Sequence, residues 1–230
     1  MHVHPLVKKQ EYRGWSCEQN GKYDVTSEVF IMKKAIVALI IVIVAICLAF
    51  GGYLLYGHLE HQRALRNYPT IYVEQITNWA EAFDLDPYYV LSIMRCESSF
   101  DPKAESSAGA IGLMQIMPDT GEWIAHKLEL DDSYQLEQLY DPEVNIRFGC
   151  WYLQFLSQRF DGDRKKMTAA YNAGHGAVQG WMEDPAYSEN GELTTIPYES
   201  TAVYYERVEQ VYESYQRLYP ELFQQRVSNG

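Results

Sequence analysis

The feature that most limits how this chain can fold is an uncharged apolar run of 22 residues, from Ala35 to Tyr56. About 20 such residues in a helix cross the hydrocarbon core of a bilayer, and a helix satisfies its backbone hydrogen bonds internally. Lys33 and Lys34 directly precede the run. Because flanking lysines favour the cytoplasmic side, the sequence predicts a single-pass cell-membrane anchor at residues 33–57, with the remaining chain on the outer side.

A cleaved signal peptide is the alternative interpretation of this run. Two lysines before an apolar segment also fit a signal peptide, with Ala49-Phe50-Gly51 as a cleavage motif, and the domain would then be secreted. The run is longer than the ~7 to 15 apolar residues of most signal peptides, which favours a retained anchor. Residues 1–32 are expected to form a disordered cytoplasmic tail, unless Met32 is the true start.

The segment after the anchor is expected to hold a polar stalk at 58–67, one globular domain at 68–222 and a tail at 223–230. Beyond Tyr56 there are 13 Lys and Arg against 27 Asp and Glu, a net charge of −14. A domain this acidic repels phosphate backbones, so we exclude nucleic acid as a partner.

Asp86 and Pro87 form a helix start, because Asp caps free amides and Pro suits the first helical position. One arc of this helix carries three apolar residues and one carboxylate: Val90, Ile93, Met94 and Glu97. Loss of hydration raises the pKa of such an acid, as a general acid near neutral pH requires. The alternative is a buried glutamate satisfied by hydrogen bonds or an ion pair, or one that caps the helix end.

The stretch from Ser106 to Ile116 mixes serine, glycine and apolar residues and is expected to be irregular or briefly extended. Its two glycines permit close approach of backbone to a ligand, and Gln115 offers an amide for polar recognition. Elsewhere the periodicity predicts a mainly α domain with one small irregular or β patch. Helices are expected over 69–84, from 118 to about 127, from 142 to near 160, through 167–173, and over a last segment with Tyr204, Val208, Val211, Tyr215 and Leu218 inward; loops are expected at 128–140 and 185–197.

Cys96 and Cys150 are the exported cysteines, and a disulfide between them is possible outside the cell. The alternative is two small buried hydrophobic residues. The six histidines lack neighbouring ligand motifs, and Asp131 and Asp132 lack the spacing of a calcium loop. We therefore expect no metal and no cofactor.

Three blocks in order resemble the SLT-type lytic transglycosylases of the lysozyme-like superfamily. They are ESSFDPKAESSAGAIGLMQIMP from Glu97, AAYNAGHGAV from Ala169 and IPYESTAVYYERV from Ile196. The resemblance covers about residues 68–222 and implies a lysozyme-like α+β fold. One departure is Ser200-Thr201, where the family often has Glu-Thr before the late tyrosine, with Glu199 one step earlier.

The resemblance implies cleavage of the β-1,4 bond between N-acetylmuramic acid and N-acetylglucosamine without water, giving 1,6-anhydro ends, with Glu97 as the single catalytic acid. Asp101, before Pro102, is interpreted as a turn residue rather than a second carboxylate. The alternatives are a hydrolytic muramidase on the same fold and a non-catalytic wall-binding scaffold. Implied substrate-binding residues are Ser98, Met114, Gln115, Tyr171, Asn172 and Tyr204.

Overall fold

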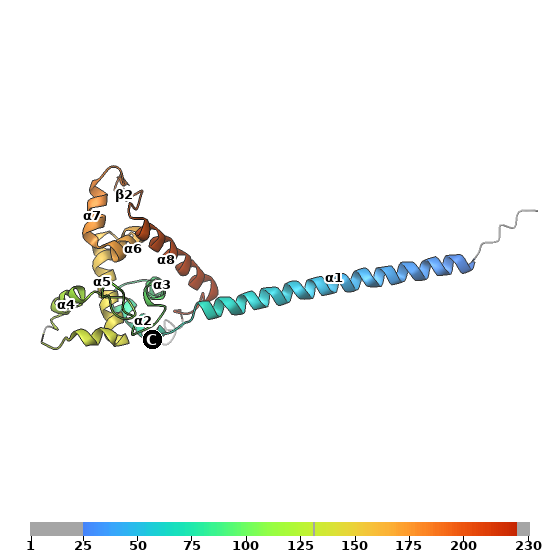
Figure 1. Ribbon diagram of the computed structural model, residues 1–230, viewed down its shortest axis with the longest axis horizontal. Coiled ribbons are helices and arrows are strands. Elements are labelled where there is room, and N and C mark those ends of the chain that lie inside the picture. The colour runs from blue at the N-terminus through green and yellow to red at the C-terminus, as the bar shows by residue number, and fades with distance from the viewer. Residues whose placement is uncertain (1–24, 131, 225–230) are drawn as a thin grey trace, which may run out of the picture. The chain divides into compact units, whose positions relative to one another are not determined.

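The computed structural model describes residues 25–130 and 132–224, which divide into two compact units between Glu60 and His61. Helix α1 (Val25–Asn67) begins in the first unit and is unbroken along its length (Figure 1). It is long and apolar enough to cross a membrane, and its apolar window is wholly exposed within the chain's own structure. The expected segments at 1–24 and 225–230, and Asp131 of the acidic pair, lie outside the described residues.

One expectation about the ends of α1 needs correction: residues 25–32, expected in a disordered tail, are helical. The expected polar stalk at 58–67 continues the same helix. Extending an existing helix adds one hydrogen bond for each residue ordered, whereas starting one is costly. The polar sequence on both sides of the apolar run therefore continues the same helix.

The second unit is mainly α with a small β part, which confirms the expected fold class (Figure 1). Its elements are α2 (Val73–Ala82), α3 (Pro87–Ser98), α4 (Pro118–Lys127), the 3₁₀ helix η1 (Leu136–Tyr140), α5 (Pro142–Arg159), α6 (Arg164–Ala173), α7 (His175–Glu183), the antiparallel strands β1 (Ser188–Glu189) and β2 (Glu192–Leu193), and α8 (Glu199–Leu218).

Helix α3 begins as its sequence predicts. The Asp86 carboxylate accepts a hydrogen bond of 2.8 Å from the amide of Tyr88, and Pro87 occupies the first turn. Val90, Ile93 and Met94 on the inward arc are fully buried. Helix α8 packs along α3, the helix that carries the candidate acid.

The irregular stretch after α3 is held by an amide from α5. Asn145 is fully buried; its Oδ1 accepts from the amide of Met114 at 2.7 Å, and its Nδ2 donates to the carbonyls of Ile111 and Leu139. Gly112 has φ +80°, and a Cβ there would overlap the side chain of Asn145. Isolated bridges from Ile111 form the small β patch expected in this stretch.

Four elements were not predicted. The loop at 128–140 contains η1, which starts with a capping box between Gln135 and Gln138. Helix α7 follows α6 directly, and the loop at 185–197 contains the hairpin of β1 and β2. The hairpin is held from α6, where Lys166 Nζ donates to the carbonyl of Gly191 at 2.7 Å and pairs with Asp163 at 3.0 Å.

The possible disulfide is not formed, because Cys96 and Cys150 are both free thiols. Cys150 is fully buried in the core on α5, as the alternative of a small buried hydrophobic residue requires. Cys96 is half-buried on α3, where its carbonyl accepts a hydrogen bond from Arg207 of α8. The side chain of Cys96 therefore belongs to the surface between α3 and α8.

Candidate active site

Glu97 lies in the last turn of α3 and is half-buried. Its Oε1 accepts a hydrogen bond of 2.5 Å from the hydroxyl of Tyr204. Burial raises the pKa of Glu97, while the Tyr204 hydrogen bond and the positive charge of Arg207 oppose this shift without cancelling it. Within the described residues Glu97 has no ion-pair partner. The carboxyl group therefore favours its protonated form more than an exposed glutamate does.

Two tyrosines lie close to the acid. Tyr204 of α8 is buried, and its pKa is well above the ordinary value because of burial and the adjacent charge of Glu97. Tyr171 of α6 has its pKa raised by the same two causes, and its hydroxyl donates to the carbonyl of Met114 at 2.8 Å. Both hydroxyls thus remain protonated donors at neutral pH.

Ser98 joins the end of α3 to the irregular stretch. Its hydroxyl donates to the carbonyl of Leu113 at 2.7 Å and accepts from the amide of Phe100 at 3.1 Å. The two residues after the helix, Ser99 and Phe100, have φ values of 53° and 70°, which non-glycine residues rarely adopt. This strained turn brings the chain back beside the acid, and the Ser98 hydroxyl stabilises it.

Met114, which the resemblance implies as a substrate-binding residue, has a fully buried side chain. It packs so closely against Gly149 of α5 that a Cβ on Gly149 would overlap it. Gln115 is half-buried with φ 48°, and its Nε2 donates to the carbonyls of Ala104 and Gly112 at 3.1 and 3.0 Å. Of these two residues, only Gln115 presents a side chain near the surface.

Asn172 is exposed at the carboxyl end of α6, and its Oδ1 accepts a hydrogen bond of 2.8 Å from the hydroxyl of Thr201. Thr201 is buried in the first turn of α8, at the point where the sequence departs from the resembled family. Glu199 and Ser200 are both exposed there. Although the sequence departs from the family here, the hydroxyl of Thr201 orients the Asn172 amide through its hydrogen bond.

Asn145 and Arg207 were not predicted as part of the site. Asn145 supports the stretch that carries Gln115, and the one sequence signal for it was an amide beside Ile146 on the inward face of α5. Arg207 lies on α8 one turn after Tyr204, with its guanidinium carbon 5.6 Å from the centre of the Tyr204 ring. A cation three residues from the expected late tyrosine was the available signal.

Asp101 and His175 are two further titratable side chains whose surroundings differ from those of Glu97. The Asp101 carboxylate is exposed and accepts from the amide of Lys103 at 2.9 Å, which is typical of a turn residue. His175 is half-buried against the ring of Phe155, and its pKa is lowered by burial and by Arg159. Among the described residues, no group of three His, Cys, Asp or Glu side chains could hold a metal ion.

A helical unit built around one poorly hydrated carboxylic acid at the end of a buried helix defines a lysozyme-like class of protein. The chain belongs to the family described as the transglycosylase SLT domain, whose model matches residues 74–193. It is 35% identical to a soluble lytic murein transglycosylase of Salmonella typhimurium over 71% of this chain and 25% of that protein.

Two solved structures have the same fold. The 70 kDa soluble lytic transglycosylase of Escherichia coli has a TM-score of 0.62 and 32% identity, over 67% of this chain and 25% of that one. An inactive Glu-to-Gln mutant of the lytic transglycosylase Slt of Pseudomonas aeruginosa has a TM-score of 0.59 and 33% identity, over 66% and 25%. The chain thus spans about a quarter of the length of these relatives.

Proposed function

We propose that this chain is a lytic transglycosylase that cleaves the glycan strands of peptidoglycan without water. The cleaved bond is the β-1,4 bond between N-acetylmuramic acid and N-acetylglucosamine. The observation that carries this proposal is the poorly hydrated Glu97 with its 2.5 Å hydrogen bond from Tyr204, in a chain of the SLT family. The inactive Glu-to-Gln mutant of the Pseudomonas aeruginosa relative supports the assignment of an essential glutamate.

The reaction needs one group that gives a proton and then takes one back. Protonated Glu97 donates to the glycosidic oxygen, and the 2-acetamido oxygen of the substrate closes onto C1 as the bond breaks. Ionised Glu97 then accepts the proton of the C6 hydroxyl, whose oxygen attacks C1 and displaces the acetamido oxygen. The product carries a 1,6-anhydro ring, and the acid returns to its starting form.

The surroundings of Glu97 suit both halves of this cycle. Burial favours the protonated acid of the first half, and the Tyr204 hydroxyl favours the carboxylate of the second. A pKa between these limits lets one side chain act as acid and as base near neutral pH. Tyr204 is therefore proposed to stabilise the ionised state of Glu97.

Substrate contacts are proposed for polar side chains near the acid. Asn172 is exposed and oriented by Thr201, and Gln115 is half-buried with its amide nitrogen fixed to backbone carbonyls. Their positions suit recognition of acetamido and hydroxyl groups on a glycan. Tyr171 and Ser98 are proposed to shape the site, since both hydroxyls donate to carbonyls of residues 113 and 114.

The proposal includes retention at the cell membrane through α1. Its apolar segment and the preceding Lys33 and Lys34 support a single crossing, with the amino end in the cytoplasm and the catalytic unit on the wall side. Secretion after signal cleavage is the alternative. Fractionation of cells separates the two, because a retained anchor keeps the full-length chain in the membrane fraction.

The test is digestion of purified wall sacculi by the full chain in lipid nanodiscs, with the products identified by mass. We expect products that end in 1,6-anhydro-N-acetylmuramic acid, and no digestion by Glu97→Gln. Reducing ends that carry one added water would instead identify a hydrolytic muramidase. Binding of sacculi without turnover by the wild-type chain would identify a wall-binding scaffold.

A further inference from the structure

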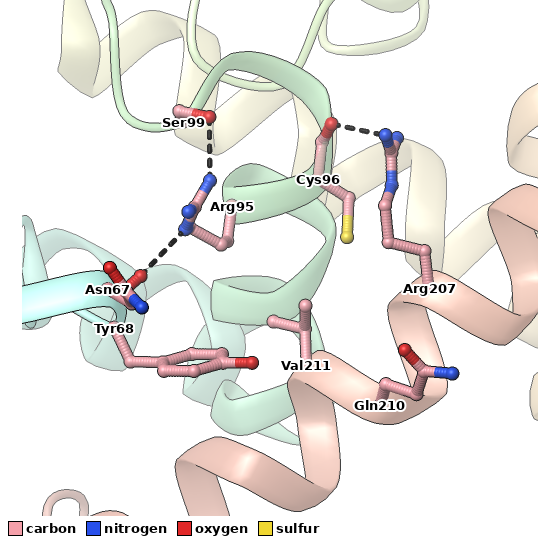
Figure 2. A pocket seen from close by; sticks show the side chains of 8 residues that line it. All are labelled: Asn67, Tyr68, Arg95, Cys96, Ser99, Arg207, Gln210 and Val211. Carbon is pink, nitrogen blue, oxygen red and sulfur yellow. Dashed lines mark hydrogen bonds between the residues drawn. The ribbon is translucent and has the colours of Figure 1, made fainter. Parts of the chain in front are cut away.

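A cationic pocket lies between α3 and α8, on the side of α3 that carries Arg95, Cys96 and Ser99 (Figure 2). Its volume is about 350 Å³, at the lower end of the range for small-molecule sites. The lining residues are Asn67, Tyr68, Arg95, Cys96, Ser99, Arg207, Gln210 and Val211. None of them is acidic, although the exported part of the chain carries a net charge of −14.

Both guanidiniums of the pocket are held in place by neutral groups. Arg95 donates from Nε to the carbonyl of Asn67 at 3.2 Å and from Nη1 to the hydroxyl of Ser99 at 2.6 Å. Arg207 donates from Nη2 to the carbonyl of Cys96 at 3.0 Å. Within the described part of the chain, neither forms an ion pair with a carboxylate.

Two unpaired arginines beside one cavity favour an anion. Each guanidinium has five N–H donors, and the hydrogen bonds above use two on Arg95 and one on Arg207. The remaining donors suit the two oxygens of a carboxylate, which arginine binds through paired hydrogen bonds.

The other residues that line the pocket indicate the kind of molecule to which the anionic group belongs. Asn67 and Gln210 each offer an amide that both donates and accepts, which matches the groups of a peptide bond. Tyr68, Val211 and the thiol of Cys96 offer apolar surface for a small side chain (Figure 2). A cavity of about 350 Å³ exceeds the needs of a lone inorganic ion and accommodates a short segment of chain.

From these contacts we infer that the pocket binds the free carboxyl end of a short peptide, with the carboxylate between Arg95 and Arg207. The amides of Asn67 and Gln210 pair with the last peptide bond, and a small terminal side chain packs against Tyr68 and Val211. Glu97 does not line this pocket, and the occupancy of the pocket can be measured without turnover.

The pocket is connected to the acid through Arg207. Glu97 is faced by Tyr204 and Arg207 from α8, by Tyr171 from α6 and by Cys96 on its own helix. The charge of Arg207 lowers the pKa of Glu97, so a carboxylate bound to Arg207 offsets that effect and raises this pKa. Peptide binding is therefore expected to extend the protonated state of the acid to higher pH.

The binding test uses the full chain in lipid nanodiscs and three probes: N-acetyl-alanyl-alanine, its neutral carboxamide, and inorganic phosphate. Calorimetric titration is expected to show binding of the carboxylate at least tenfold tighter than that of the carboxamide, weakened by salt. Bound peptide is also expected to slow alkylation of Cys96 by iodoacetamide, with the fully buried Cys150 as an unreactive reference.

Arg207→Gln is expected to weaken carboxylate binding at least tenfold, because it removes one of the two cations. Arg217→Gln is the matched control: it is an exposed arginine of the same helix, outside the pocket, and its loss changes the net charge equally. Equal binding of carboxylate and carboxamide, or equal loss in both variants, would overturn the inference. Tight binding of phosphate without binding of the peptide would also overturn it.

The connection to Glu97 has its own readout, which rests on the proposed function. With saturating carboxylate peptide, the alkaline limb of the pH–rate profile on sacculi is expected to move to higher pH, and the carboxamide is expected to leave it unchanged. Arg207→Gln is expected to remove this shift. A chain that binds peptide yet never cleaves sacculi would reject the proposed function and leave the peptide site standing.

Discussion

A tyrosine of α8 donates a hydrogen bond to a carboxylate at each end of α3, and the two carboxylates differ in their surroundings. Tyr212 donates to Asp86 at the amino end, and Tyr204 donates to Glu97 at the carboxyl end, both at 2.5 Å and both from α8. Asp86 is exposed and also accepts from a free amide of the helix start. Glu97 is half-buried, and burial raises its pKa.

The polarity of the helix separates the two carboxylates further. The amino end of a helix carries partial positive charge and stabilises an anion, whereas the carboxyl end carries partial negative charge and destabilises one. Asp86 is thus a cap whose charge the backbone favours, and Glu97 is an acid whose charge the backbone opposes. A hydrogen bond from tyrosine therefore does not identify a catalytic carboxylate, but its place along the helix and its burial do.

The largest expected effect is a difference in activity between variants at the two ends of α3. Glu97→Gln removes the proton donor while keeping the side chain's shape, and turnover of sacculi is expected to fall by a factor of about 10³, within the usual range for a general acid–base residue. Asp86→Asn makes the same change at the other end, where asparagine also caps a helix. It is expected to retain most of the activity, and comparable losses in both variants would remove the distinction between the two ends.

The tyrosines provide the next test. Tyr204→Phe removes the hydrogen bond that favours ionised Glu97, so the rate is expected to fall about tenfold, the loss of one hydrogen bond to a charged group. The pKa of Glu97 rises, because this bond lowers it. The alkaline limb of the pH–rate profile, where the acid loses its proton, is therefore expected to move to higher pH. Tyr212→Phe serves as the control and is expected to leave that limb in place.

For the free energy of unfolding, the larger effect is expected at Asp86, the end of α3 whose substitution is expected to change activity little. Asp86→Ala removes the cap of α3 and the partner of Tyr212, and is expected to lower the free energy of unfolding by about 1 to 2 kcal/mol. Thermal unfolding of the full chain in nanodiscs measures this change. Asp141→Ala, which removes the cap of α5 without a tyrosine partner, gives the reference for the cap alone.

The smallest expected effect is a change in how stability depends on pH. Glu97 has a raised pKa in the folded chain, so it binds its proton more tightly there than in the unfolded chain. Its contribution is complete below the unfolded pKa and is lost as pH rises through the folded pKa. Glu97→Gln is expected to flatten this decline relative to the wild type, and an unchanged slope would show that Glu97 is well hydrated.

The amino end of α3 and the arc leading to Glu97 could be predicted because their signals are local. Asp86-Pro87 is a start signal, and a period of 3.6 residues places Glu97 with Val90 and Met94. The resemblance to the family could also be seen in local sequence, in the three blocks that start at Glu97, Ala169 and Ile196. Helix α7 has two glycines, which disfavour helix, and it forms because Val178 and Trp181 bury themselves against the core.

The parts that could not be predicted depend on partners far away in the sequence. The resemblance implies Met114 as a substrate-binding residue, and the burial of its side chain follows from the space that Gly149 leaves on α5. The role of Asn145 follows from the carbonyl of Ile111 and the amide of Met114, which are 34 and 31 positions away. The thiols of Cys96 and Cys150 could not be placed, since side-chain direction and separation come from packing rather than from spacing.

Ser99 and Phe100, the two residues after α3 with left-handed backbone conformation, limit which substitutions the chain can accept at these positions. Each non-glycine residue in that conformation costs of order 1 kcal/mol, and glycine at position 99 would remove part of that cost together with the hydroxyl that Arg95 binds. A library selected only for heat resistance should therefore accept glycine there. A library selected for wall lysis should keep serine, so parallel selection would reveal whether rigidity beside the acid contributes to fitness.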